Sequence, residues 1–277
     1  MIEFLIVLAI IWLVTASISD LKKYEVPNWL SFSLIVFVLA FRAFYSVANN
    51  DLMFFVYGLL GFLVFFVLAY VFYYSRLFAG GDAKLLMGLG AVLPFSNSIS
   101  SNLLISGIFI FLFLVVGSVY GLLYSGVLVF MNKNKFVNEF KKQFKLRKIF
   151  VLIGLIFSLA SFVFVFYFKD VILVLLPLVI ILFPVLFIYG KSVEEACMIK
   201  EIPGKKVTIG DWLYEEIKVG KKRIKPNWEG LDEKEVKLLS RVKKVKIKYG
   251  IPFVPSFLFA FILLILLKDY FLNLLLI

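Results

Sequence analysis

The sequence predicts an all-α membrane protein that crosses the bilayer several times, from its composition and from the length of its apolar runs. Of its 277 residues, 62% are hydrophobic and 17% are charged, and the mean hydropathy is +1.01. Soluble domains contain roughly 45–50% apolar and about 25% charged residues. Two soluble cores would not bury this much apolar surface. The composition also excludes a disordered chain and a disulfide-linked secreted domain.

Eight apolar segments account for the hydrophobic fraction, and six to eight of them are expected to be full spans. A helix needs about 20 apolar residues to cross ~30 Å of hydrocarbon. Residues 85–132 contain no charge and are too many for one helix, so we divide this run at the turn signal 94–98. The shorter half, 83–95, is short for a full span and suits a half-helix at a functional site. The segments are 2–19, 28–47, 52–75, 83–95, 101–131, 149–168, 171–190 and 249–267.

The first segment has no basic beginning and no cleavage site, so we expect it to be retained. The basic residues predict the orientation of the segments. The four loops on one side, at 20–27, 76–84, 132–148 and 191–248, carry 27 of the 30 Lys and Arg residues. The other side holds Arg42, Lys169 and Lys268.

This asymmetry predicts a multi-pass protein of the plasma membrane with cytoplasmic basic loops and both termini outside. The net charge of +12 is then mainly a topology signal. We expect no nucleic-acid binding, because the basic residues are spread over four loops.

Residues 191–248 form the one long polar stretch and predict a small cytoplasmic α+β insert. Strands are expected at 206–209 and 216–219. Asp232 and Glu235 fit a capping box that opens a helix to about Lys246. The insert contains no catalytic constellation, and a surface for a partner is the simplest interpretation.

The chain is therefore expected to contain three parts. Residues 1–190 are expected to form a helical membrane domain. The insert at 191–248 follows, and residues 249–277 provide the last transmembrane helix.

Few residues can perform acid–base chemistry. The chain has no histidine and one cysteine, Cys197, which excludes a Cys/His zinc site and a His-based triad. We expect no metal and no cofactor. Ionisable residues at membrane depth are costly and usually functional. Asp20 closes the first segment and Asp82 opens the fourth, both at cytoplasmic ends, so they meet if these two helices pack together.

Two adjacent carboxylates share one proton, so that one member activates water while the other donates to a substrate carbonyl. Gly80 and Gly81 would allow an extended substrate to approach Asp82 closely. Lys84 lies off the helical face that carries Asp82. Its position suits tuning of the pKa of the site or contact with a lipid headgroup. Three other aspartates at helix ends on the outer side are interpreted as interfacial residues: Asp51, Asp170 and Asp269.

Three stretches resemble the family of type IV prepilin peptidases and archaeal preflagellin peptidases, which are membrane aspartic proteases of the GxGD type. They are 20–29, where Asp20 is followed by Val-Pro-Asn; 80–90, with Gly-Gly-Asp; and 250–255, with Pro-Phe-Val-Pro. The resemblance implies that Asp20 and Asp82 are catalytic. It implies prepilin or preflagellin precursors as substrates, with a short basic leader cut at the cytoplasmic membrane face.

Two departures from the family pattern are visible. Ala79 stands where the GxGD motif has its first glycine. The Cys-x-x-Cys pairs of the bacterial members are absent, so no N-methyltransferase activity is expected, and an archaeal source fits.

Two alternatives remain at this point. A presenilin-like or signal-peptide-peptidase-like protease would cut within the bilayer, but that group has Tyr before its first aspartate, and here Ser19 precedes Asp20. An ion-coupled transporter would use the aspartates as ion sites, and the lack of inverted repeats counts against it.

Overall fold

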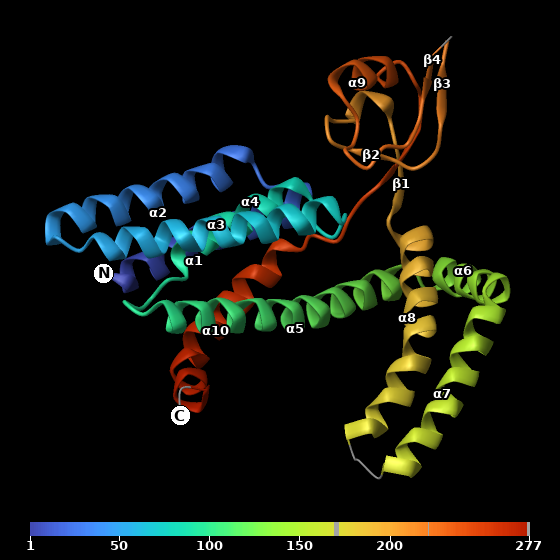
Figure 1. Ribbon diagram of the computed structural model, residues 1–277. Coiled ribbons are helices and arrows are strands. Elements are labelled where there is room, and N and C mark those ends of the chain that lie inside the picture. Colours follow the sequence, from blue (N-terminus) through green and yellow to red (C-terminus); the bar gives the residue numbers. More distant parts are fainter. Residues whose placement is uncertain (169–171, 221, 276–277) are drawn as a thin grey trace. The chain divides into compact units, whose positions relative to one another are not determined.

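The computed structural model describes residues 1–168, 172–220 and 222–275 (Figure 1). The expectations for Lys169 and Asp170 lie outside the described residues. The chain forms two compact units. The first unit comprises Met1–Leu123 with Ile251–Ile277, and the second comprises Tyr124–Gly250.

Seven helices within the described ranges are long and apolar enough to cross a membrane. They are α1 (Ile2–Lys23), α2 (Asn28–Asn49), α3 (Leu52–Tyr74), α5 (Ile99–Met131), α7 (Lys148–Phe168), α8 (Leu175–Cys197) and α10 (Val254–Leu275). The eighth apolar segment forms α4 (Gly80–Val92), whose 13 residues span about 20 Å, short of the ~30 Å hydrocarbon layer. The predicted fold class, a helical polytopic membrane protein, is confirmed.

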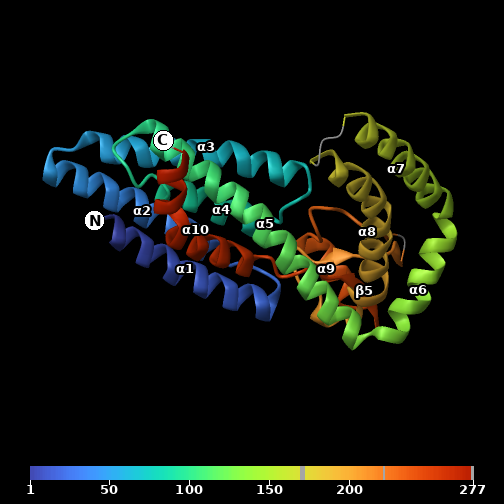
Figure 2. The same cartoon turned by 90° about the horizontal axis from the view of Figure 1, so that it is seen from below.

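Helix α4 is buried among α1, α2 and α3 in the first unit (Figure 2). Glycines permit this close packing. A Cβ atom on Gly61 of α3 would lie 2.2 Å from the carbonyl oxygen of Gly90 of α4, and one on Gly88 would lie 2.8 Å from Leu34 of α2. Small residues on α4 therefore let it pack tightly against its neighbours.

The carboxyl end of α4 is held by Arg42 of α2, which is fully buried. Its guanidinium donates to the carbonyls of Ala91, Val92 and Pro94 at 2.8, 3.1 and 2.7 Å. A fourth hydrogen bond, of 2.8 Å, reaches the carbonyl of Phe54 in α3. The last carbonyls of a helix have no partner within the helix, so Arg42 supplies the donors that α4 lacks. The charge pattern had placed Arg42 merely on the outer side.

Helix α10 runs beside α1 in the first unit (Figure 2). Its beginning also packs against the part of α5 that belongs to this unit. The rings of Phe113 and Phe257 lie 4.4 Å apart, and a Cβ on Gly117 would lie 2.7 Å from Phe253.

In the second unit, residues 132–148 were expected to be a loop, and this is wrong. They contain helix α6 (Lys133–Leu146). Phenylalanines spaced by four explain why: the ring centroids of Phe136 and Phe140 lie 5.7 Å apart, and those of Phe140 and Phe144 lie 6.5 Å apart. This stripe packs on α8 through Phe136 and Tyr189, at 5.6 Å.

The polar insert contains strands and a helix, as expected. A three-stranded antiparallel sheet has the order β1–β5–β2, and β3 pairs with β4. The elements are β1 (Ile199–Ile202), a 3₁₀ turn η2 (Gly204–Lys206), β2 (Trp212–Leu213), β3 (Ile217–Val219), β4 (Lys222–Ile224), α9 (Glu233–Leu239) and β5 (Val245–Lys248). A further 3₁₀ turn, η1 (Ile172–Val174), precedes α8.

Two details of the insert differ from expectation. No strand forms at 206–209, where η2 ends. The capping box of Asp232 and Glu235 is present, but α9 ends at Leu239 instead of continuing to Lys246. Residues 245–248 form the central strand β5 instead, since Val245 and Ile247 alternate into the small core.

We expect Arg42→Met to destabilise the first unit by about 3 kcal/mol or more, because four buried carbonyls lose their donor. Arg42→Lys keeps the charge but not the planar guanidinium group. The stability of this variant should lie between that of Arg42→Met and that of the native protein. Thermal unfolding of the detergent-solubilised protein measures the difference.

Glycine substitutions provide a matched test of the packing around Arg42. A Cβ at Gly58 would lie 2.2 Å from the Cδ of Arg42, whereas at Gly107 it meets nothing within 4 Å. Gly58→Ala should therefore lower the melting temperature, and Gly107→Ala should leave it unchanged or raise it. Equal melting temperatures for the two variants would show that the Arg42 contacts contribute little.

Candidate active site

Asp20 lies in the last turn of α1 and is 6% exposed. Its Oδ2 atom accepts a hydrogen bond of 2.9 Å from the backbone N–H of Val254. Val254 is the first residue of α10, and N–H groups in the first turn of a helix have no partner within that helix. The Asp20 carboxylate thus caps α10, and the positive end of the helix dipole faces it.

Asp82 lies in the first turn of α4 and is half-buried. Its Oδ2 accepts a hydrogen bond of 3.3 Å from the N–H of Ala79, the residue that precedes the helix. Helices α1 and α4 are in contact, and the carboxylate of Asp20 acts electrostatically on that of Asp82. The structure therefore brings together the two aspartates that the sequence singled out.

The residues expected to support the motif have distinct surroundings. A Cβ on Gly81 would lie 3.1 Å from the Cβ of Val26, so this glycine allows the loop before α2 to pack on α4. A Cβ on Gly80 would meet only Tyr73, at 3.8 Å, an ordinary contact. Gly81 is thus the glycine that close packing requires.

Lys84 connects α4 to the beginning of α2. Its Nζ donates to Oδ1 of Asn28 at 2.6 Å and lies 5.2 Å from the ring centroid of Phe32. Asn28 lies in the stretch 20–29 and Lys84 in the stretch 80–90, and the hydrogen bond joins these two stretches across 56 residues.

Tyr120 of α5 was not identified from the sequence. The carboxylate of Asp20 acts electrostatically on its hydroxyl. Phe113, Gly117 and Tyr120 follow one another at spacings of four and three, so they share the face of α5 that packs on α10. The spacing alone could have suggested that Tyr120 faces inward, but nothing local in the sequence connects it to Asp20.

No group of three or more His, Cys, Asp or Glu residues forms a metal site among residues 1–168, 172–220 and 222–275. The first unit offers a pair of carboxylates, of which the more buried one, Asp20, accepts a backbone hydrogen bond and acts electrostatically on Tyr120.

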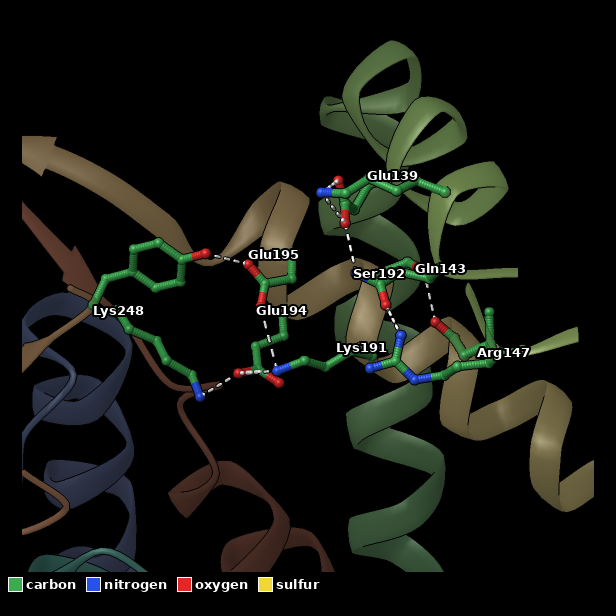
Figure 3. A network of polar contacts seen from close by, with 11 residues as sticks. Glu139, Gln143, Arg147, Lys191, Ser192, Glu194, Glu195 and Lys248 are labelled. Carbon is green, nitrogen blue, oxygen red and sulfur yellow. Dashed lines mark hydrogen bonds and ion pairs between the residues drawn. The ribbon is translucent and has the colours of Figure 1, made fainter. Parts of the chain in front are cut away.

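A second group of polar residues lies within the second unit (Figure 3). Lys191 pairs with Glu194 at 3.1 Å and with Glu195 at 3.3 Å, and Lys248 pairs with Glu194 at 2.6 Å. The hydroxyl of Tyr214 donates to Glu195 at 2.6 Å, and this bond raises the pKa of Tyr214 to about 12. These carboxylates neutralise lysines and join α8 to the insert.

Cysteine crosslinking tests the proximity of the two aspartates without an activity assay. In a Cys197→Ser background, Asp20→Cys with Asp82→Cys should be joined by a short bifunctional thiol reagent. The pair of Asp20→Cys with Asp51→Cys is the control, since Asp51 precedes α3 at the opposite end of α2. Peptide mass spectrometry detects the link, and equal yields in both pairs would contradict the geometry.

The comparisons with known proteins concern the amino-terminal part of the chain. Residues 7–126 match the model of the type IV leader peptidase family. The chain is 36% identical over 87 residues to a preflagellin peptidase of Methanocaldococcus jannaschii and 33% identical over 94 residues to one of Methanococcus maripaludis. A prepilin peptidase, EppA, of Methanothermobacter thermautotrophicus is 33% identical over 86 residues.

These matches are partial. They cover 31%, 34% and 31% of this chain and 37%, 40% and 22% of the respective relatives. No solved structure matches the chain. The matched residues 7–126 include Asp20 and Asp82, and the match confirms that this region resembles the type IV leader peptidase family.

Proposed function

We propose that the protein is a membrane aspartic endopeptidase that removes the short basic leader of prepilin or preflagellin-type precursors at the cytoplasmic membrane face. The observation that carries this proposal is the shared site of Asp20 and Asp82, within the region that matches leader peptidases. The names of the relatives support this class of substrate.

The surroundings of the carboxylates suggest a role for each. Hydrogen bonds from backbone N–H groups favour the ionised form of a carboxylate. Asp20 accepts a buried bond of 2.9 Å, whereas the bond to Asp82 is longer and more exposed. We therefore assign the ionised state to Asp20 and the shared proton to Asp82.

The reaction then balances without a covalent intermediate. Asp20 takes a proton from water as the water oxygen bonds to the carbonyl carbon of the scissile peptide. Asp82 donates its proton to the carbonyl oxygen. When the C–N bond breaks, the proton held by Asp20 passes to the leaving nitrogen, and Asp82 recovers its proton from the hydroxyl.

The location of the carboxylates supports cleavage near a membrane face rather than at the bilayer centre. Asp20 lies at the end of α1 and Asp82 at the beginning of α4. The positive-inside pattern assigns that face to the cytoplasm. With Cys197 as the single cysteine, no N-methyltransferase activity is proposed.

Asp20→Asn and Asp82→Asn should each lower kcat for leader removal by about 10²–10⁴-fold, because each removes one acid–base group. Co-expression with a prepilin or preflagellin, followed by gel analysis of the leader, is the measurement. Asp51→Asn is the matched control, because Asn still caps α3. Full cleavage by either site variant would exclude the proposed pair.

Val254→Pro tests the hydrogen bond to Asp20 directly. Proline lacks the N–H but is well tolerated at the first position of a helix, so the geometry of α10 is preserved. A hydrogen bond to a charged group contributes about 1.5–3 kcal/mol. We therefore expect kcat to fall about 10–100-fold while KM changes little.

Val254→Ala is the control for this substitution, since it shortens the side chain but keeps the N–H. Native kcat in Val254→Ala together with reduced kcat in Val254→Pro would support a positioning role of the N–H. Equal losses of kcat in both variants would attribute the effect to packing.

A further inference from the structure

Helix α6 is strongly basic and amphipathic. The stretch 133–148 carries seven Lys and Arg residues and one acidic residue, Glu139. Glu139 is already engaged, because it accepts hydrogen bonds from Gln143 at 2.6 Å and Lys142 at 3.2 Å, and these bonds lower its pKa (Figure 3). Val137 and Phe144 remain 37% and 45% exposed beside the basic face. Such a helix is typical of the interface between headgroups and acyl chains.

An apolar groove of about 410 Å³ lies between α7 and α8. Gly154 of α7 faces Pro184 of α8, where a Cβ would lie 2.8 Å from the proline Cγ. Around this contact the wall is aromatic and aliphatic, with Phe150 and Phe157 from α7 and Val179 and Phe183 from α8. The groove therefore fits a hydrocarbon chain.

Two cations stand at the α6 end of this groove. The guanidinium of Arg147 lies 5.8 Å from the ring centroid of Phe187, and Phe187 lies 5.8 Å from Phe150, which lines the groove. Lys148 is the first residue of α7. Arg147 donates to the neutral Gln143 (Figure 3). Neither Arg147 nor Lys148 forms an ion pair with a carboxylate in the described part of the chain.

We propose that this groove, with Arg147 and Lys148 at its end, binds an anionic phospholipid of the surrounding bilayer. An acyl chain lies between α7 and α8, and the phosphate pairs with the two cations. Charge complementarity selects this occupant, because an apolar protein helix would leave both cations without a partner. The proposal does not depend on the peptidase activity.

Native mass spectrometry of the full-length protein in detergent tests the site. We expect phosphatidylglycerol to be retained at least about tenfold more tightly than phosphatidylcholine with the same acyl chains, since each cation near a headgroup contributes roughly 1 kcal/mol. Arg147→Gln with Lys148→Gln should abolish this preference. Arg147→Lys keeps the positive charge and should preserve the preference for phosphatidylglycerol. This variant therefore separates the effect of lost charge from that of a folding defect.

Lys141→Gln with Lys145→Gln is the matched control, because it removes the same charge from the exposed face of α6. Val179→Trp should fill the groove and weaken phosphatidylglycerol binding while both cations remain. Equal retention of the two lipids, equal losses in the two double variants, or a second copy of the chain bound in place of lipid would overturn the proposal.

Discussion

The first unit is organised around a helix that is too short to cross a bilayer and whose ends must nevertheless find partners. An unpaired carbonyl in an apolar environment costs several kcal/mol, and no water is present in hydrocarbon to relieve it. Arg42 meets this requirement at the carboxyl end of α4, where one side chain donates to carbonyls of α3, α4 and the loop beyond. A buried arginine is itself costly, and its four acceptors are what make its burial tolerable.

Backbone N–H groups at the beginning of a helix also need partners, and in the candidate active site the aspartates provide them. Asp82 accepts from the N–H of Ala79 just before α4, and Asp20 accepts from the first N–H of α10. Each carboxylate proposed for chemistry is therefore also a cap of a helix. The positions of the two aspartates are tied to the ends of rigid helices, and such a connection holds acid–base groups in place better than a mobile loop would.

Local patterns were sufficient for much of this architecture. The uncharged runs predicted the apolar helices, and the rarity of carboxylates at membrane depth identified Asp20 and Asp82. The role of Arg42 was not predictable, because its acceptors Ala91, Val92 and Pro94 lie 49 to 52 residues further along the chain. The N–H of Val254 is 234 residues from Asp20 and belongs to the backbone, so no residue type signals it.

The insert shows a different limit of sequence reasoning. Val242 and Val245 match the spacing of a helical stripe that begins at Val236, and this favoured a long helix. Val245 and Ile247 equally match the alternation of a strand, and pairing with β1 on one side and β2 on the other decided between the two. Antiparallel neighbours supply backbone partners that a local pattern does not contain.

Arg42 fastens α4 at the end opposite Asp82. The helix is fastened by several hydrogen bonds at Val92 and its surroundings, whereas its other end carries Asp82 about ten residues away. Ten residues correspond to roughly 15 Å of helix, so a tilt of about 10° around the fastened end would displace Asp82 by roughly 2.6 Å. Gly81 packs closely on Val26 one residue before Asp82, so contacts at both ends of α4 oppose such a tilt and hold the separation of the two carboxylates constant.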